Sequence, residues 1–175
     1  MTTDSKIGVA VLMDRIAAPN RWEDWGFRLV DVIPDAVGDA STAPRLVETD
    51  GPRTRWLHPG FTLELFPDEC KGYFLNLTSG RPAWFVSWMP GANDISQIEI
   101  TSVSVSYIEA DRRMFAEEHV ENVALPSELC EWLRLYTNRH FKPDGERKVR
   151  AQSFLSPQER EAKRAAPDAG SACDV

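Results

Sequence analysis

Residues 59–90 read PGFTLELFPDECKGYFLNLTSGRPAWFVSWMP, and this part of the chain is the most informative about the fold class. It contains three short apolar and aromatic runs, at 61–66, 72–78 and 84–88, and turn-forming residues lie between them. Runs of this composition, bounded by Pro, Asp, Gly and Ser, are typical of antiparallel strands. The five-residue connector 67–71 has the length of a hairpin loop. The stretch therefore predicts three successive strands of an antiparallel sheet.

Further strands are expected on both sides of residues 59–90. The apolar run 7–13 indicates a buried strand, and 25–33 alternates in the way that a half-buried strand does. Short strands are predicted at 44–49 and 54–58, the second ended by Pro59-Gly60, and 98–107 alternates almost without interruption. A short helix is expected within 109–119 and extended chain at 120–125.

The clearest helix spans 126–141. Pro126 suits a first helical turn, and Glu128 and Glu131 favour the positive end of the helix dipole. An apolar stripe repeats at steps of three and four residues; it comprises Leu129, Trp132, Leu133, Tyr136 and His140. The predicted fold class is therefore α+β, a mainly antiparallel sheet, barrel-like or sandwich-like, with one C-terminal amphipathic helix packed on it.

Composition divides the chain into two parts. Residues 1–145 are expected to form a single α+β domain, and 146–175 a flexible, charged and mostly disordered tail with few large apolar residues. Residues 142–175 carry seven Lys and Arg against six Asp and Glu, whereas the rest of the chain carries 13 against 21. An acidic body argues against binding to nucleic acid or to an anionic membrane, because phosphate contacts need clustered cations.

Several other classes of function lack a motif. No apolar run is long enough to span a membrane and no signal peptide is visible, so a cytoplasmic protein is expected. Three cysteines without a C-x-x-C pair fit a reducing compartment, and the three histidines lack the spacing of metal ligands. The glycines form no phosphate-binding loop. We therefore expect no metal and no cofactor.

Six tryptophans in 175 residues stand out, because exposed indoles are favoured anchors of protein interfaces. Trp22 and Trp25 flank Glu23-Asp24 in a polar connection, where exposure is more plausible than in an apolar strand. The others are expected to pack in the core. The sequence by itself shows no reaction.

Several segments together resemble DUF3305, a bacterial family of unknown function whose genes often neighbour those of molybdenum-dependent formate dehydrogenase. The segments are 9–15 (VAVLMDR), 20–25 (NRWEDW), 73–79 (YFLNLTS), 84–88 (WFVSW), 103–111 (VSVSYIEAD) and 118–126 (EHVENVALP). The resemblance covers roughly residues 6–150. It implies an accessory role in the assembly, maturation or regulation of a formate dehydrogenase or a similar molybdoenzyme, and it supplies no catalytic residue.

We accordingly expect a non-catalytic protein that binds a partner polypeptide, namely a formate dehydrogenase subunit or a maturation factor. The predicted contact residues are Arg15, Asn20, Arg21, Trp22 and Trp25, with a second contact in the tail at Arg150, Phe154 and Leu155.

Two alternatives remain open. One is an enzyme that uses a sheet-lined polar pocket containing Tyr73, Asn76, Tyr107 and Glu109. The other is a sensor that stacks a pterin or a nucleotide on Trp84 or Trp88.

Overall fold

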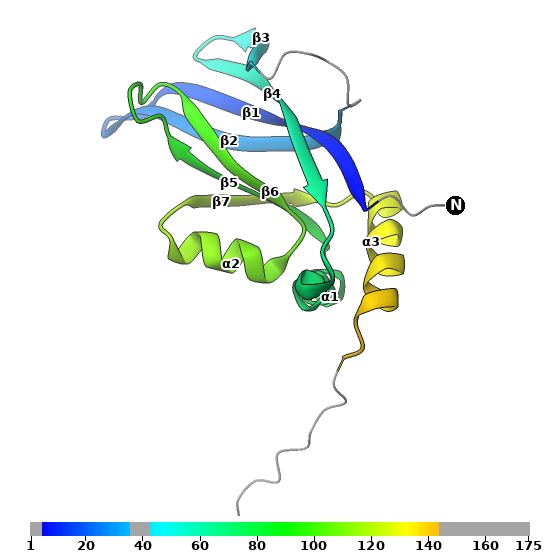
Figure 1. Cartoon of the computed structure of the whole chain (residues 1–175). Helices are drawn as coiled ribbons and strands as arrows, with labels where there is room; N and C mark the ends of the chain where they lie inside the picture. Colours follow the sequence, from blue (N-terminus) through cyan, green and yellow to red (C-terminus); the bar gives the residue numbers. More distant parts are fainter. Residues whose placement is uncertain (1–4, 36–42, 144–175) are drawn as a thin grey trace, which may run out of the picture. The chain divides into compact units, whose positions relative to one another are not determined.

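The computed structural model describes residues 5–35 and 43–143, and these contain seven strands and three α-helices (Figure 1). The strands are β1 (Lys6–Asn20), β2 (Glu23–Pro34), β3 (Arg45–Asp50), β4 (Arg53–Glu64), β5 (Ala83–Pro90), β6 (Ile98–Ser104) and β7 (His119–Ala124). The helices are η1 (Pro67–Glu69, a 3-10 turn), α1 (Cys70–Thr78), α2 (Tyr107–Phe115) and α3 (Ser127–His140). The predicted fold class, α+β with mainly antiparallel sheet, is confirmed.

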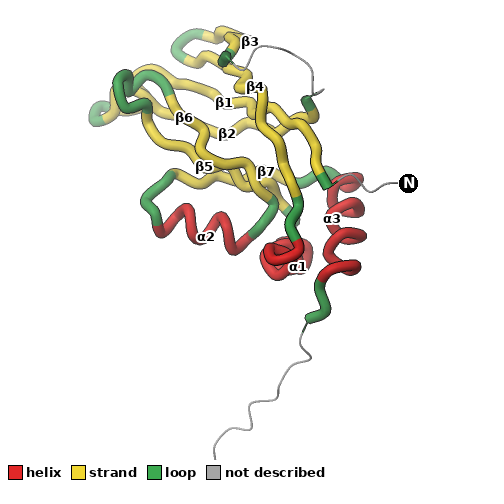
Figure 2. The backbone as a smooth tube through the Cα atoms, in the orientation of Figure 1, coloured by secondary structure: helices red, strands yellow, loops and turns green. Residues whose placement is uncertain are grey.

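The strands form two separate sheets, both antiparallel throughout their described pairings. One has four strands in the order β2-β1-β4-β3, and the other has three in the order β6-β5-β7. Among the described residues the sheets do not close into a barrel. They are stacked as a sandwich, with β2 beside β7 and β4 beside β6, and α2 lies on the far side of the three-stranded sheet (Figures 1 and 2).

The core lies between the two sheets and extends to α1 and α3. Val9, Val11 and Met13 of β1 face Trp84, Val86 and Trp88 of β5, because side chains of one parity point to one face of a strand. Leu133 and Tyr136 of α3 complete the core beside Tyr73 of α1, and the Tyr136 hydroxyl donates to the Leu65 carbonyl at 2.9 Å. The predicted helix at 126–141 is thus confirmed as α3.

The strand predicted at 72–78 was wrong, since these residues belong to α1. The buried residues of α1 include Cys70, Tyr73 and Asn76, which are three positions apart and so lie on one face of a helix, whereas Leu75 is 40% exposed. The predicted hairpin loop at 67–71 was wrong for the same reason. Pro67 followed by two acidic residues is a helix-start pattern, and η1 continues directly into α1.

Several strand boundaries also differ from the prediction. Pro59-Gly60 does not end a strand: β4 runs through it with a bulge, because Val9 pairs with Phe61 and Val11 pairs with His58. Gly60 adopts a positive φ of 87° there, which a residue without Cβ permits. The strands predicted at 7–13 and 25–33 are longer than expected: β1 continues to Asn20 and β2 begins at Glu23, so the polar connection between them is part of the hairpin. The strand predicted at 98–107 ends at Ser104.

A second bulge changes which residues of β2 face the core. Leu12 pairs with Asp31 whereas Met13 pairs with Leu29, so Val30 is the extra residue. Leu29 and Val32 are both buried as a consequence, although strict alternation assigns them to opposite faces.

Candidate protein-binding groove

The structure brings the five predicted contact residues in the domain to one end of the four-stranded sheet, around the β1–β2 hairpin. The turn is held by Asn20, whose Oδ1 accepts a hydrogen bond from the Trp22 backbone N–H at 2.9 Å and whose Nδ2 donates to Glu23 Oε2 at 2.7 Å. These bonds are the local device by which Asn favours a turn. They position the Trp22 side chain at the hairpin tip with 82% of its surface exposed.

Arg21 and Arg15 both lie over indole rings, but in different settings. The Arg21 guanidinium is 4.6 Å from the centroid of the exposed Trp22 ring. The Arg15 guanidinium lies 4.9 Å from the Trp25 centroid and 5.1 Å from that of Trp56, and its Nη1 donates to the Ser96 carbonyl at 3.1 Å. Arg15 therefore ties the hairpin to the loop before β6, and it is less accessible to a partner than Trp22.

A groove of about 530 Å³ opens beside this hairpin, between the start of β2, the end of β5 and the start of β7. Its aromatic and apolar lining comprises Trp22, Trp25, Phe27, Trp88, Ile95 and His119. The Trp88 and His119 rings stack with centroids 4.2 Å apart and planes 13° from parallel, and Phe27 meets Trp88 edge-on at 5.5 Å. The groove thus has a rigid aromatic wall and, in Trp22 and Ile95, exposed apolar side chains at its margin.

The charged residues that line the groove are all acidic: Glu23, Asp24 and Glu121. Glu121 Oε2 accepts a hydrogen bond from the Leu29 backbone N–H at 2.8 Å, which joins β7 to the edge of β2. The groove therefore combines apolar surface with a negative rim.

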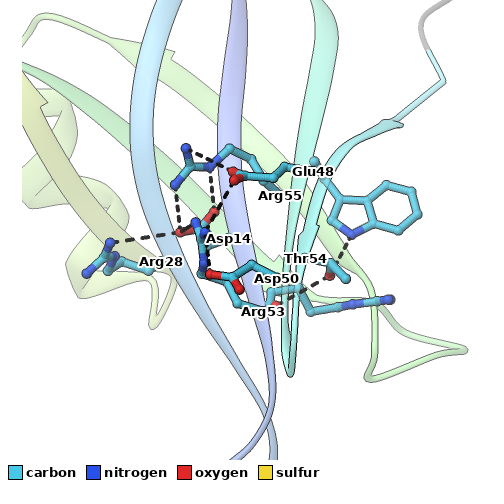
Figure 3. Close-up of polar contacts among 9 residues, drawn as sticks. Asp14, Arg28, Glu48, Asp50, Arg53, Thr54 and Arg55 are labelled. Atoms are coloured by element: carbon cyan, nitrogen blue, oxygen red, sulfur yellow. Dashed lines mark hydrogen bonds and ion pairs between the residues drawn. The ribbon is translucent and has the colours of Figure 1, made fainter.

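Asp14 forms a charged cluster on the outer face of the four-stranded sheet (Figure 3). Its side chain has no exposed surface, its Oδ1 is 2.8 Å from Arg55 Nε, and its Oδ2 is 3.4 Å from Arg53 Nη1. Arg28 Nη2 approaches Oδ2 at 3.8 Å from the strand on the other side. The hydrogen bonds from Arg55 lower the pKa of Asp14, burial opposes this, and Arg53 lowers it further.

Strand register explains the cluster. Asp14 pairs with Arg28 on β2 and with Arg55 on β4, and Arg55 in turn pairs with Glu48 on β3. The row across the sheet therefore alternates in charge, which is the favourable cross-strand arrangement. Sequence reasoning missed it because these residues are neighbours only after the strands pair. The cluster stabilises the sheet that carries the hairpin.

Of the four polar residues of the enzyme alternative, Tyr73 and Glu109 line one cavity, whereas Asn76 and Tyr107 do not. Asn76 is buried, and its amide bonds to Ala83 and to the Val105 carbonyl. The Tyr73 hydroxyl accepts from the Phe66 N–H, and Tyr107 packs edge-on against Phe85. The cavity that Tyr73 and Glu109 share has a volume of about 340 Å³, and the Glu109 carboxylate accepts hydrogen bonds there from the Ser102 and Ser104 hydroxyls.

The arrangement offers little to the sensor alternative either. Trp84 is 1% exposed, so no face of its ring is open to a stacked ligand, and Trp88 is 5% exposed beneath Phe27 and His119.

Within residues 5–35 and 43–143, no group of three or more His, Cys, Asp or Glu side chains has an arrangement that could hold a metal ion. In the same part of the chain, every helix is too short or too polar to cross a membrane. Arg150, Phe154 and Leu155, and the predicted tail, lie outside the described residues.

The model of the family described as "Protein of unknown function (DUF3305)" matches residues 8–150. No curated protein and no solved structure matches the chain. The match spans the groove, the Asp14 cluster and all three α-helices.

Proposed function

Since the chain belongs to the DUF3305 family, we propose that it is a non-catalytic accessory protein that binds a partner polypeptide through the groove at the β1–β2 hairpin. The observation that carries the proposal is Trp22, a large indole that is 82% exposed although its backbone is fixed by Asn20. Leaving an indole in water is unfavourable, and burying it in an interface is among the largest single contributions to binding.

The setting of Trp22 supports the same function. The groove beside it has a stacked aromatic wall, and exposed large apolar side chains lie at its margin, including Ile95 at 62% exposure. Apolar surface that is contiguous and rimmed by polar groups marks interaction sites. A rigid surface of this kind binds with little loss of conformational entropy.

We further propose that the partner is a formate dehydrogenase subunit or a maturation factor of that molybdoenzyme, and that binding takes place in the cytoplasm. This part rests on the family resemblance of the sequence, which associates these proteins with molybdenum-dependent formate dehydrogenase. The accessory role is assembly, maturation or regulation of the enzyme.

The test is co-purification from cells that make the tagged full-length protein together with the formate dehydrogenase catalytic subunit and its maturation factors from the same genome. We expect one of these polypeptides to be retained by the wild-type protein and lost with Trp22→Ala. Phe115→Ala is the matched control, because Phe115 is 83% exposed but lies on α2, away from the groove. Retention of none of these polypeptides, or equal retention by both variants, contradicts the proposal.

A further inference from the structure

We infer that the groove takes an extended segment of the partner, which pairs with the open edge of β2 and carries a Lys or Arg side chain between apolar ones. The inference rests on the proposed function and specifies the chemistry of its partner. It is supported by the backbone of β2, by the charges around the groove and by the aromatic side chains that line it.

The backbone of β2 presents an unpaired edge to the groove. Among the described residues β2 is the outermost strand of its sheet: β1 pairs with it on one side, and β7 of the other sheet lies beside it on the other without a strand pairing. The Leu29 N–H points away from β1, because it donates to Glu121 Oε2. Residues 25, 27 and 29 pair in sequence with Ala17, Arg15 and Met13, without a bulge between them.

Alternate residues of a strand direct their backbone groups to the same side, so the N–H and C=O groups of Trp25 and Phe27 point away from β1 as Leu29 does. Both residues line the groove. Glu121 covers the edge at Leu29, whereas residues 22–27, which include Trp25 and Phe27, line the groove. An edge of this kind is a template for an added strand, which is a common way of binding extended peptides.

The charges around the groove favour a basic segment. Glu23, Asp24 and Glu121 line it, and the whole chain has a formal net charge of -7. Two cations also border the groove, since the Arg21 and Arg15 guanidinium groups lie over the Trp22 and Trp25 rings, but the charged side chains of the lining itself are the three carboxylates. Complementary charge selects the partner and raises the rate of encounter. A Lys or Arg on the added strand reaches these carboxylates from the groove side of β2.

The aromatic lining favours the same side chains. Guanidinium groups already lie over indoles in this part of the molecule: Arg21 over Trp22, and Arg15 over Trp25. The Trp22 ring keeps most of its surface exposed even so. Successive side chains of an added strand point to opposite faces, so apolar residues can meet the exposed His119 ring, which covers Trp88, while the basic residue faces the rim.

The test begins with selection of random ten-residue peptides, displayed on phage, against the full-length protein. We expect the selected peptides to be enriched in Lys or Arg alternating with apolar residues. The strongest peptide is then synthesised, and its Kd is measured for the wild type, for the Glu23→Gln/Asp24→Asn double variant, for Trp22→Ala and for the control Phe115→Ala. Loss of one interface anchor weakens binding by at least about tenfold. We therefore expect the Kd to rise by this factor for the Glu23→Gln/Asp24→Asn double variant and for Trp22→Ala, and to stay unchanged for Phe115→Ala.

Backbone pairing is tested with two N-methylated forms of the same peptide, which are methylated at alternate positions of opposite parity. One form loses the donors that pair with β2 and is expected to bind at least about tenfold more weakly, and the other retains them. The inference is overturned if no peptide is selected, or if the selected peptides are acidic or uncharged. It is also overturned if both methylation patterns weaken binding equally, or if the double variant binds the peptide with an unchanged Kd. If the partner still co-purifies in a manner that depends on Trp22, the proposed function stands and only the extended basic segment is excluded.

Discussion

Gly72 and Ser106 are in contact across the junction of α1 and α2, with no room for a side chain between them. A Cβ on Gly72 would lie 2.1 Å from Ser106 Oγ and 3.3 Å from the Ile108 backbone nitrogen. The Ser106 hydroxyl caps α2 by accepting from the Glu109 N–H at 3.2 Å, and it donates to Glu69 Oε2 at 2.8 Å. The absence of a Cβ at Gly72 thus allows α1 to pack directly on the start of α2.

Gly72→Ala is expected to destabilise the fold although alanine favours helices. The added methyl must displace Ser106 Oγ, and overpacking of this kind costs about 1–3 kcal/mol, which exceeds the roughly 1 kcal/mol that alanine gains in a helix. Urea unfolding followed by circular dichroism measures the change. Lys71→Ala, at the exposed neighbouring position, is the control and is expected to stay within about 0.5 kcal/mol of wild type. Equal stability of the two variants would show that the contact relaxes freely.

Asn76→Asp tests the buried amide that links α1 to the strands. Asn76 Nδ2 donates to the Ala83 carbonyl at 2.8 Å and to that of Val105 at 2.9 Å, and Oδ1 accepts from the Ala83 N–H at 2.9 Å. An aspartate of the same shape faces two carbonyl oxygens, so its pKa rises above the ordinary value and its ionised form destabilises the fold by about 3 kcal/mol or more.

The stability difference between wild type and Asn76→Asp is therefore expected to be largest at neutral pH. It narrows as the pH falls through the raised pKa, because the protonated acid can donate one of the lost bonds. Thermal unfolding between pH 4.5 and pH 7.5 measures this. Asn138→Asp, on the exposed face of α3, is the control, and a difference that does not vary with pH would contradict the account.

Asp14 is expected to make stability depend on pH in the acid range. Its pKa is lowered in the folded protein by the hydrogen bonds from Arg55, against the effect of burial, and by Arg53. The folded state therefore holds the proton less tightly than the unfolded chain does. The resulting stabilisation is fully present above the unfolded pKa of about 3.9, and it is lost as the pH falls through the lower folded value.

Asp14→Asn removes this pH-dependent contribution and leaves three arginines without their shared carboxylate. Loss of one partner of a buried ion pair costs up to about 3–5 kcal/mol, and the partial exposure of the arginines places the expected cost toward 2 kcal/mol. Urea unfolding from pH 2.5 to pH 7 measures both effects. Asp111→Asn, exposed on α2, should follow the wild-type curve, and an unchanged curve for Asp14→Asn would refute the role of the cluster.

Cys70 is expected to be chemically inert in the folded protein. Burial raises the pKa of its thiol, and the nearby Asp68 raises it further, so little thiolate forms near neutral pH. Its side chain also has no exposed surface. Alkylation by iodoacetamide at pH 7.5, located by mass spectrometry of peptides, should leave Cys70 unmodified under conditions that label it fully in urea. Rapid labelling of the native protein would instead indicate an open or mobile α1.

The outcome for α1 shows where local patterns are insufficient. The run 72–78 has the aromatic and branched composition of a strand, and its local neighbours include no strong helix signal besides Pro67-Asp68-Glu69. The helix is decided by what Asn76 and Gly72 meet: the carbonyls of β5 and of residue 105, and the cap of α2. These partners are distant in sequence, so no window on the chain contains them. Tertiary contact therefore overrode composition.

The candidate groove also could be predicted only in part from the sequence. Trp22 could be identified from the sequence as a candidate anchor, since it lies in a polar connection between strands. Trp88, Ile95 and His119 could not be joined to it, because they belong to β5, the following loop and β7 and reach the groove only when the two sheets stack. The Asp14 cluster depends in the same way on the register of four strands.

Local patterns were enough to predict the antiparallel α+β class, the amphipathic helix α3 and the resemblance to DUF3305, because alternation, helical spacing and short motifs each extend over a few residues. Three features became visible only in the folded protein: residues 70–78 are helical, the two sheets stack without closing within the described residues, and an acidic, aromatic groove lies beside Trp22. The physical reason is that these features depend on contacts between residues far apart along the chain, whose energies no local pattern contains.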